Sequence, residues 1–355
     1  MLHKLLAAGA LISTILLSGC AQTGLKMPAL WAPAAEETAP VAAQTGPWRP
    51  FSADSPWNTP IAADAKIDPN SDILMGGFAA LNTLYINMAE WSVAVYPVDS
   101  RKAPKRYVRD LYQGQYGPGF GPLKRVPIPE GASAAGPDFG TGYLVLEDRK
   151  AGKAWEMRQA GQDLDGTWFT GFGAQVDLNG TGVKTPWMQA KEPSLAGSPR
   201  PSGLPLLAGL IRTEELKAGK IEHALAFGSP NVRRGMFVSP ASTAPAPVDG
   251  APAKALGMPL GTRLQLDPSY DIENTKLSPE GKTIARALQT YGAILVEEAG
   301  GNVLYAEAAP AQLADWRDVL TPEEMHLLFT PEFMSKNFRV LEIGEPLAGK
   351  AAVAK

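Results

Sequence analysis

Apolar and polar positions alternate over many short stretches of this chain, and a period of two residues predicts β-strands with one buried face. The clearest pair is 143–148 and 154–159, which a polar turn joins into a predicted β-hairpin. An Asp165-Gly166 turn leads into a further predicted strand near 167–170. Shorter strands of the same kind are predicted at 91–96, 221–227, 235–239, 262–266 and 339–343.

A period near 3.6 residues, which predicts an amphipathic helix, marks only a few segments. In the best of them Ile284, Leu288 and Tyr291 share one face. Pro279 takes the first position of this helix and Gly292 ends it. Shorter helices are predicted at 213–218 and from 321 onward, where Thr-Pro-Glu-Glu forms a capping box.

The balance of these elements decides the predicted fold class. A second hairpin is expected from 293–298 and 302–306, which an Ala-Gly-Gly turn separates. The strands do not alternate regularly with helices, which argues against a doubly wound parallel sheet. We therefore predict a mainly β fold: an antiparallel β-sandwich or jelly-roll-like domain with a few inserted short helices.

The first twenty residues carry a different pattern. Lys4 precedes an almost wholly apolar run over 5–17, shorter than the roughly 20 apolar residues that a membrane-spanning helix needs. The run ends in Leu17-Ser18-Gly19-Cys20, which resembles the lipobox of bacterial lipoproteins. That resemblance implies a signal peptide over 1–19 and a lipid attached to Cys20, the only cysteine of the chain.

The remaining chain divides by composition. Residues 20–47 are rich in Ala and Pro and are predicted to form a tether, because such a segment buries too little apolar surface to fold. Residues 48–345 are predicted to form a single β-rich domain and 346–355 a tail. The lipobox resemblance implies an exported protein that contacts the lipid bilayer through acylated Cys20. Within this resemblance, Ala21 directly after Cys20 is compatible with sorting of the lipoprotein to the outer membrane. The domain would then face the periplasm or the cell surface.

Charge and composition exclude several classes of function. A net charge of −3 leaves no basic surface for nucleic acid. Beyond the signal peptide the only histidines are His223 and His326, which excludes a site of three histidines. The runs at 163–166 and 177–180 lack the spacing of calcium loops, and no nucleotide-binding or serine-hydrolase motif occurs. We predict neither a metal nor a cofactor.

Four stretches of the predicted domain are similar to segments of exported bacterial proteins. They are residues 55–61, 202–212, 221–227 and 259–269. The resemblance assigns no catalytic residue, so the candidate residues come from the strand pattern alone.

His223 is the first candidate for chemistry. In the predicted strand 221–227 it shares a face with Ile221, Leu225 and Phe227. Either it is a buried histidine hydrogen-bonded within the core, or it is a base at the edge of a cleft, since imidazole titrates near neutrality. His326 lies in a predicted amphipathic helix and is expected to be structural.

Polar side chains also line one face of two predicted strands. Glu156 and Arg158 alternate with apolar neighbours, and Arg263 and Gln265 do the same. If both strands belonged to one sheet, these residues would floor a groove for sugars, and an arginine would pair with a uronate carboxylate. An ordinary solvated sheet face with cross-strand ion pairs is the alternative.

Aromatic side chains supply the other candidate contacts. Tyr143, Trp168, Trp187 and Tyr116 are predicted to lie near loops, where their rings would contact a sugar. Packing within the core is the alternative.

These patterns predict a membrane-anchored envelope lipoprotein whose β-rich domain binds or cleaves an envelope polysaccharide. In a polysaccharide lyase, Tyr143 or His223 would remove a proton next to a uronate carboxylate. Arg158 or Arg263 would neutralise that carboxylate. In a glycoside hydrolase, Glu156 and a second acid would form the catalytic pair. A non-catalytic structural or protein-interaction lipoprotein is the alternative, and the long tether fits it equally well.

Overall fold

The computed structural model describes residues 48–81, 83–112, 119–120, 125–136, 142–184, 198–247, 257–308, 316, 319–326 and 328–348. These residues all belong to one compact unit that spans 43–355. Cys20, the predicted signal peptide and the predicted tether up to residue 47 lie outside the described residues.

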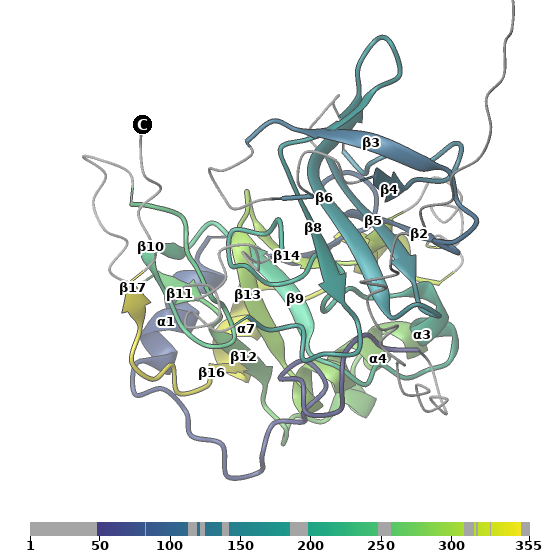
Figure 1. The fold of residues 1–355 in the computed structure, drawn as a ribbon. Helices are drawn as coiled ribbons and strands as arrows, with labels where there is room; N and C mark the ends of the chain where they lie inside the picture. Colours follow the sequence, from purple (N-terminus) through teal and green to yellow (C-terminus); the bar gives the residue numbers. More distant parts are fainter. Residues whose placement is uncertain are drawn as a thin grey trace, which may run out of the picture. The chain divides into compact units, whose positions relative to one another are not determined.

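The largest sheet has the strand order β15-β2-β5-β6-β7-β3-β4, with β8 also paired to β6 (Figure 1). The long strand β6 pairs with β8 through its first six residues and with β7 through its last two. Its strands are β2 (Val93–Pro97), β3 (Lys105–Asp110), β4 (Arg125–Pro127), β5 (Gly142–Asp148), β6 (Lys153–Gln162), β7 (Trp168–Thr170), β8 (Phe172–Asp177) and β15 (Glu307–Ala308).

A second sheet of six strands has the order β1-β14-β9-β13-β12-β16. Its strands are β1 (Leu84–Asn87), β9 (Leu225–Ser229), β12 (Arg263–Leu266), β13 (Ala293–Glu298), β14 (Asn302–Tyr305) and β16 (Phe338–Val340). A small third sheet contains β10 (Val232–Phe237), β11 (Met258–Leu260) and β17 (Leu347–Ala348). The chain passes from β14 in the second sheet to β15 in the first through Ala306 alone, so the two larger sheets are directly connected there.

The helices are short and are set between the strands. They are α1 (Ser71–Ala79), α3 (Thr213–Lys217), α4 (Pro279–Thr290), α6 (Pro322–His326) and α7 (Pro331–Asn337), with a 3₁₀ turn η2 (Ile272–Asn274). Helix α4 begins at Pro279, as predicted. Ser278 is its N-cap, and the Ser278 hydroxyl accepts a hydrogen bond from the Gly281 N–H. At α6, Thr321 and Glu324 exchange the reciprocal hydrogen bonds of a capping box.

The predicted mainly β fold with a few short helices is confirmed. The larger sheets mix antiparallel and parallel pairs: β5 and β6 are antiparallel, whereas β2 and β5 are parallel. The predicted hairpin of 143–148 and 154–159 forms as β5 and β6.

The predicted hairpin of 293–298 and 302–306 is wrong. Its two strands form as β13 and β14, but β9 lies between them and pairs with both. The pattern of apolar residues gives each strand correctly. It does not show that a strand from about 70 residues earlier occupies the place between them, because that insertion depends on long-range packing.

Successive side chains of β6 point into two different hydrophobic cores. Ala154 faces the main core, whereas Trp155 and Met157 belong to a smaller core within the first sheet. Glu156 and Arg158 therefore lie on the face of β6 that looks toward the second sheet rather than toward solvent. This places charged groups between two sheets, where unpaired charges are costly.

Candidate functional site

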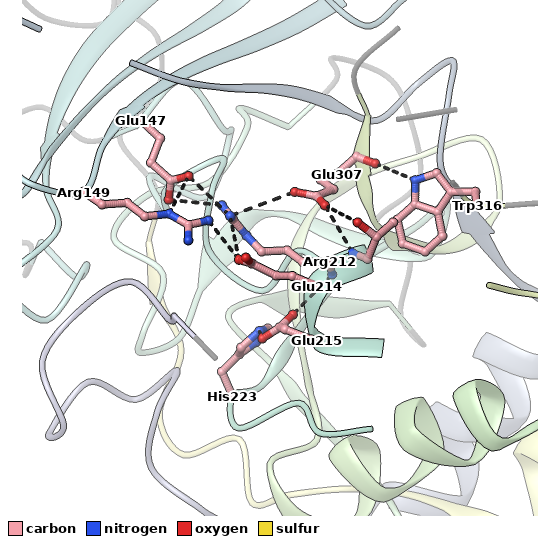
Figure 2. A network of polar contacts seen from close by, with 9 residues as sticks. Glu147, Arg149, Arg212, Glu214, Glu215, His223, Glu307 and Trp316 are labelled. Carbon is pink, nitrogen blue, oxygen red and sulfur yellow. Dashed lines mark hydrogen bonds and ion pairs between the residues drawn. The ribbon is translucent and has the colours of Figure 1, made fainter. Parts of the chain in front are cut away.

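Two polar clusters lie along one face of β5, on either side of Val145. Tyr143 begins this face and Glu147 ends it. We call the first group, Tyr143, Arg158, Arg200, Glu297 and Tyr305, the Tyr143 cluster. We call the second group, Glu147, Arg149, Arg212, Glu214, Glu215, His223 and Glu307, the Arg212 network (Figure 2).

A bulge positions the Tyr143 cluster. The register of β5 and β6 shifts between Gly142 and Tyr143, so that Gln159 has no direct partner and adopts φ 53°. A positive φ is uncommon for a residue with a side chain, and bulges of this kind re-aim neighbouring side chains. As a result Tyr143 stands directly opposite Arg158, and both side chains are half-buried.

The hydroxyl of Tyr143 connects the two sheets. Its Oη donates a hydrogen bond of 2.6 Å to Oε2 of Glu297, which lies on β13. Nε of Arg200 lies 3.7 Å from the other oxygen of Glu297, and the Arg200 guanidinium lies 5.0 Å from the ring centre of Tyr305. Arg200, Glu297 and Tyr305 are all buried, so they form an inner layer beneath Tyr143 and Arg158.

Burial raises the pKa of Tyr143 well above its usual value, and the negative charge of Glu297 raises it further. The same two causes raise the pKa of Tyr305. Both hydroxyls are therefore protonated near neutral pH. Tyr143 is thus a donor held on a carboxylate, and it cannot act as a free phenolate base.

Part of the hydrogen-bonding capacity of the inner layer is unused within the described residues. Nε and Nη1 of Arg200 and Oε1 of Glu297 are buried and have no hydrogen-bond partner there. Nη2 of Arg200 does donate to the carbonyl of Leu206. Buried polar atoms are nearly always satisfied, and exceptions concentrate where a protein binds or transforms a ligand.

Glu156 does not belong to an accessible pair of acids. Its side chain is fully buried and accepts from the Ser198 hydroxyl at 2.7 Å and from the N–H groups of Leu206 and Leu207 at 2.8 and 3.0 Å. Burial raises the pKa of Glu156. The predicted role in a hydrolase is therefore wrong, because Glu156 anchors the segment 198–207 against β6 and has no free oxygen for a substrate.

The predicted groove floor does not form either. Arg263 and Gln265 lie on β12 in the second sheet, whereas Glu156 and Arg158 lie on β6 in the first. Arg263 donates to the carbonyls of Tyr291 and Thr59. Burial lowers its pKa to about 10. Gln265 is buried; it donates to the Gln289 carbonyl and accepts from Arg339.

The structure describes only some of the aromatic residues that were predicted to contact a sugar. Trp168 is buried in the smaller core of the first sheet, so its predicted contact with a sugar is wrong and the core interpretation is confirmed. Trp187 and Tyr116 lie outside the described residues. Of the five predicted catalytic residues, the structure brings together Tyr143 and Arg158.

The Arg212 network fills the other end of the same face (Figure 2). The guanidinium of Arg212 donates to both oxygens of Glu147 at 3.2 and 3.3 Å and lies 3.9 Å from Glu307. Arg149 connects Glu147 to Glu214. The ring of Trp48 covers both arginines, 4.2 Å from Arg149 and 4.9 Å from Arg212. Every strong acceptor here is already paired, which favours a structural role.

His223 belongs to this network and is buried. Its Nε2 lies 2.9 Å from Glu215, and its Nδ1 lies 2.9 Å from the carbonyl of Ala224. The strand predicted at 221–227 begins only at Leu225, and the N–H of the preceding Ala224 donates to the carbonyl of Trp57. The interpretation of His223 as a buried, hydrogen-bonded histidine is confirmed, and its predicted role as a base is wrong.

We expect His223→Gln to remove a pH-dependent part of the stability. Burial lowers the pKa of His223, but the Glu215 charge and hydrogen bond outweigh it and the net shift is upward. A raised histidine pKa contributes to the free energy of unfolding. The contribution is fully present below about pH 6.5, the unfolded-state pKa, and is lost as pH rises through the folded-state pKa. Urea unfolding at pH 6 and at pH 9 should therefore show a larger loss for the variant at pH 6.

The control for this prediction is Glu215→Gln, which removes the partner charge. It should weaken the same pH dependence while leaving the imidazole in place. Profiles of wild type and His223→Gln that run parallel from pH 6 to pH 9 would show that folding leaves the pKa of His223 unchanged, which contradicts the prediction.

Sequence patterns missed the inner layer of the Tyr143 cluster. Glu297 follows the apolar run of β13, so a charged residue at the end of a buried strand was its only signal. Tyr305 ends β14 and has the appearance of an ordinary core aromatic. Arg200 lies in a proline-rich segment without periodicity, and nothing in the sequence connects it to β13.

Comparison of the chain with protein-family models, curated proteins and solved structures gives no match. Within the described residues, no group of three or more His, Cys, Asp or Glu side chains is placed to hold a metal ion. No helix in this part of the chain is long and apolar enough to cross a membrane.

Proposed function

We propose that this protein is an exported lipoprotein of the cell envelope whose β-rich domain binds or cleaves a polysaccharide at the Tyr143 cluster. The observation that carries the proposal is the 2.6 Å hydrogen bond from Tyr143 to Glu297, at a half-buried position beside Arg158. A hydroxyl donor, a carboxylate and a guanidinium together supply the directional contacts that sugar hydroxyl and carboxylate groups need.

The cluster supports elimination better than hydrolysis. In β-elimination, Tyr143 takes the proton from the carbon next to a uronate carboxylate while its own proton passes to Glu297. The electrons of the broken C–H bond form a double bond and expel the glycosidic oxygen. That oxygen takes a proton from Tyr143, which recovers one from Glu297. Protons and charge balance over the cycle, and a positioned proton donor of this kind contributes about 10²–10⁴ in rate.

Hydrolysis needs two carboxylates on either side of the scissile bond, about 5–9.5 Å apart. Glu297 supplies one, but Glu156 is committed to Ser198 and to backbone N–H groups. The structure therefore offers no obvious second acid among the residues of the Tyr143 cluster.

The test uses the chain from residue 21 onward and a panel of neutral and uronate-containing envelope polysaccharides. Ultraviolet absorbance of unsaturated products indicates a lyase, and new reducing ends without that absorbance indicate a hydrolase. Retention on a polysaccharide without cleavage indicates a binding protein. If no polysaccharide is cleaved or retained, the proposal fails and the non-catalytic lipoprotein replaces it.

The proposed membrane attachment has its own test. We expect Cys20→Ala to abolish incorporation of a labelled fatty acid and to leave the protein with an uncleaved signal peptide. Growth with the label, followed by membrane fractionation and intact-mass measurement, checks both results. Ser18→Ala is the control, because a small residue remains before Gly19. Unchanged labelling of Cys20→Ala would contradict lipidation at this residue.

A further inference from the structure

The turn between β1 and β2 carries an exposed tryptophan in a strained backbone conformation. Trp91 is 59% exposed and has φ 60°, in the left-handed region that large side chains rarely adopt. The side chain of Asn87 donates to the carbonyl of Trp91 at 3.0 Å and holds the turn in place. Among the described residues other than glycine, only Phe51 and Gln159 also have a positive φ. Strained residues of this kind cluster at ligand-binding and active sites.

Strand register places this turn beside the Tyr143 cluster. β1 ends at Asn87, whose register partner on β14 is Tyr305. β2 begins at Val93, whose register partner on β5 is Tyr143. Both partners are members of the Tyr143 cluster. The turn 88–92 therefore passes from the second sheet to the first at the place where this cluster joins them.

Trp91 lies within reach of a ligand that extends beyond Tyr143. It precedes Val93 by two residues, and two residues span at most about 7 Å. Paired strands lie about 4.8 Å apart, so the Cα atoms of Trp91 and Tyr143 are within about 12 Å of each other. Neighbouring sugars of one polysaccharide chain cover a separation of this size.

The Tyr143 cluster presents mainly polar groups to a sugar, because Tyr305 is only 3% exposed. Hydrogen bonds to sugar hydroxyl groups replace bonds to water, so their net contribution to affinity is small. Ligand sites accordingly combine a few polar groups with apolar and aromatic walls. The C–H face of a pyranose ring is apolar and matches the flat face of an indole. Trp91 directly precedes β2, the neighbour of β5, whereas the exposed Tyr107 on β3 is separated from β5 by β6 and β7.

We propose that Trp91 forms a second sugar-binding subsite, where the indole stacks on the sugar next to the one held at Tyr143. This inference rests on the proposed function and adds that the ligand is a chain of linked sugars rather than a single sugar. The backbone strain at Trp91 follows from presenting its ring to this chain. Glycine at the same position would adopt the conformation without strain.

The experiment measures binding of sugar fragments by the full-length lipoprotein in detergent. Fragments of one to six sugars are prepared by partial acid hydrolysis of each neutral and uronate-containing polysaccharide of the panel. Dissociation constants are measured by calorimetry, and for a fragment that is cleaved KM is measured instead. We expect fragments of two or more sugars to bind at least about tenfold more tightly than single sugars, which corresponds to one aromatic contact.

Trp91→Gly separates the contact from the fold. This variant loses the ring and the strain together, so it should lose little stability toward urea and yet bind the longer fragments about tenfold more weakly. Its binding of single sugars should be unchanged. Trp91→Tyr keeps a ring and should retain most of the affinity, which provides a second test if the glycine variant folds poorly. Tyr107→Ala removes an exposed ring elsewhere on the sheet and is the matched control, which should bind as wild type.

Each contrary outcome has a distinct meaning. Wild-type affinity of Trp91→Gly for the longer fragments overturns the second subsite and leaves the proposed function intact. An equal loss of affinity for single sugars and longer fragments also overturns it, because the ring would then act on the sugar at Tyr143 itself. No binding of any fragment, together with no cleavage or retention of the parent polysaccharides, removes the proposed function.

Discussion

Replacing Arg212 with methionine should lower the free energy of unfolding by about 3–5 kcal/mol, because it leaves buried carboxylates without their cation. Arg212 is 3% exposed and contacts Glu147, Glu214 and Glu307. Burial alone would lower its pKa, but these glutamates raise it above the usual value, so the guanidinium is charged throughout the accessible pH range. Urea unfolding at pH 7, followed by tryptophan fluorescence, measures the loss.

The matched control is Arg286→Met, which removes an ion pair at the surface. Arg286 pairs with Glu273, and both side chains are largely exposed. Exposed pairs contribute at most about 1 kcal/mol. Adding Glu147→Gln to Arg212→Met should restore part of the stability, because it removes one of the unpaired charges. A loss for Arg212→Met no larger than that for Arg286→Met would mean that water reaches the network.

Replacing Tyr143 with phenylalanine should reduce polysaccharide cleavage by at least about 100-fold, since it removes the proton donor and leaves the ring in place. The same change removes one hydrogen bond from Glu297 and is expected to cost about 1–3 kcal/mol of stability. The measurement is the initial rate of product formation on the best substrate of the panel, at temperatures where the variant is fully folded.

Tyr107→Phe is the control, because Tyr107 is 47% exposed on β3 and lies outside the Tyr143 cluster. It should leave the rate unchanged. If Tyr143→Phe alters stability but not the rate, the Tyr143–Glu297 hydrogen bond is structural and catalysis lies elsewhere.

The dependence on pH separates two roles for Tyr143. Burial and Glu297 both raise its pKa, so the hydroxyl stays protonated between pH 6 and pH 9. A relay through Glu297 therefore predicts a rate that does not climb with pH in this range. A rate that increases steadily toward pH 10 would indicate that the phenolate itself is the base, which contradicts the relay.

Much of the secondary structure follows from local patterns. Strands β5, β6, β12 and β13, and helix α4 with its Ser278 cap, lie where periodicity and capping predict them. Local patterns succeed here because successive side chains of a strand point to opposite faces of the sheet, which gives a period of two residues. Each helix also has its start and stop signals within a few residues of its ends. Pairing across long distances is not encoded in this way, and β9 is the clearest example.

The candidate site shows the same division. Alternation correctly places Glu156 and Arg158 on one face of β6, but it does not say what covers that face. The segment 198–207 covers Glu156, and the second sheet contributes Glu297, which accepts from Tyr143 opposite Arg158. Glu156 therefore became a buried anchor, and Arg263 was placed in another sheet altogether. Tyr143 and Arg158 came together because a bulge at Gln159 sets their register.

The mainly β class, most strand positions and the polar face of β6 follow from the sequence alone, because they depend on residues close together in the chain. The sequence also carries the lipobox pattern that predicts export and attachment at Cys20. Which polar groups are buried and paired depends on how the sheets and loops pack, because burial is set by what covers each face. The contact of Tyr143 with Glu297 joins residues 154 positions apart, and no local pattern specifies it.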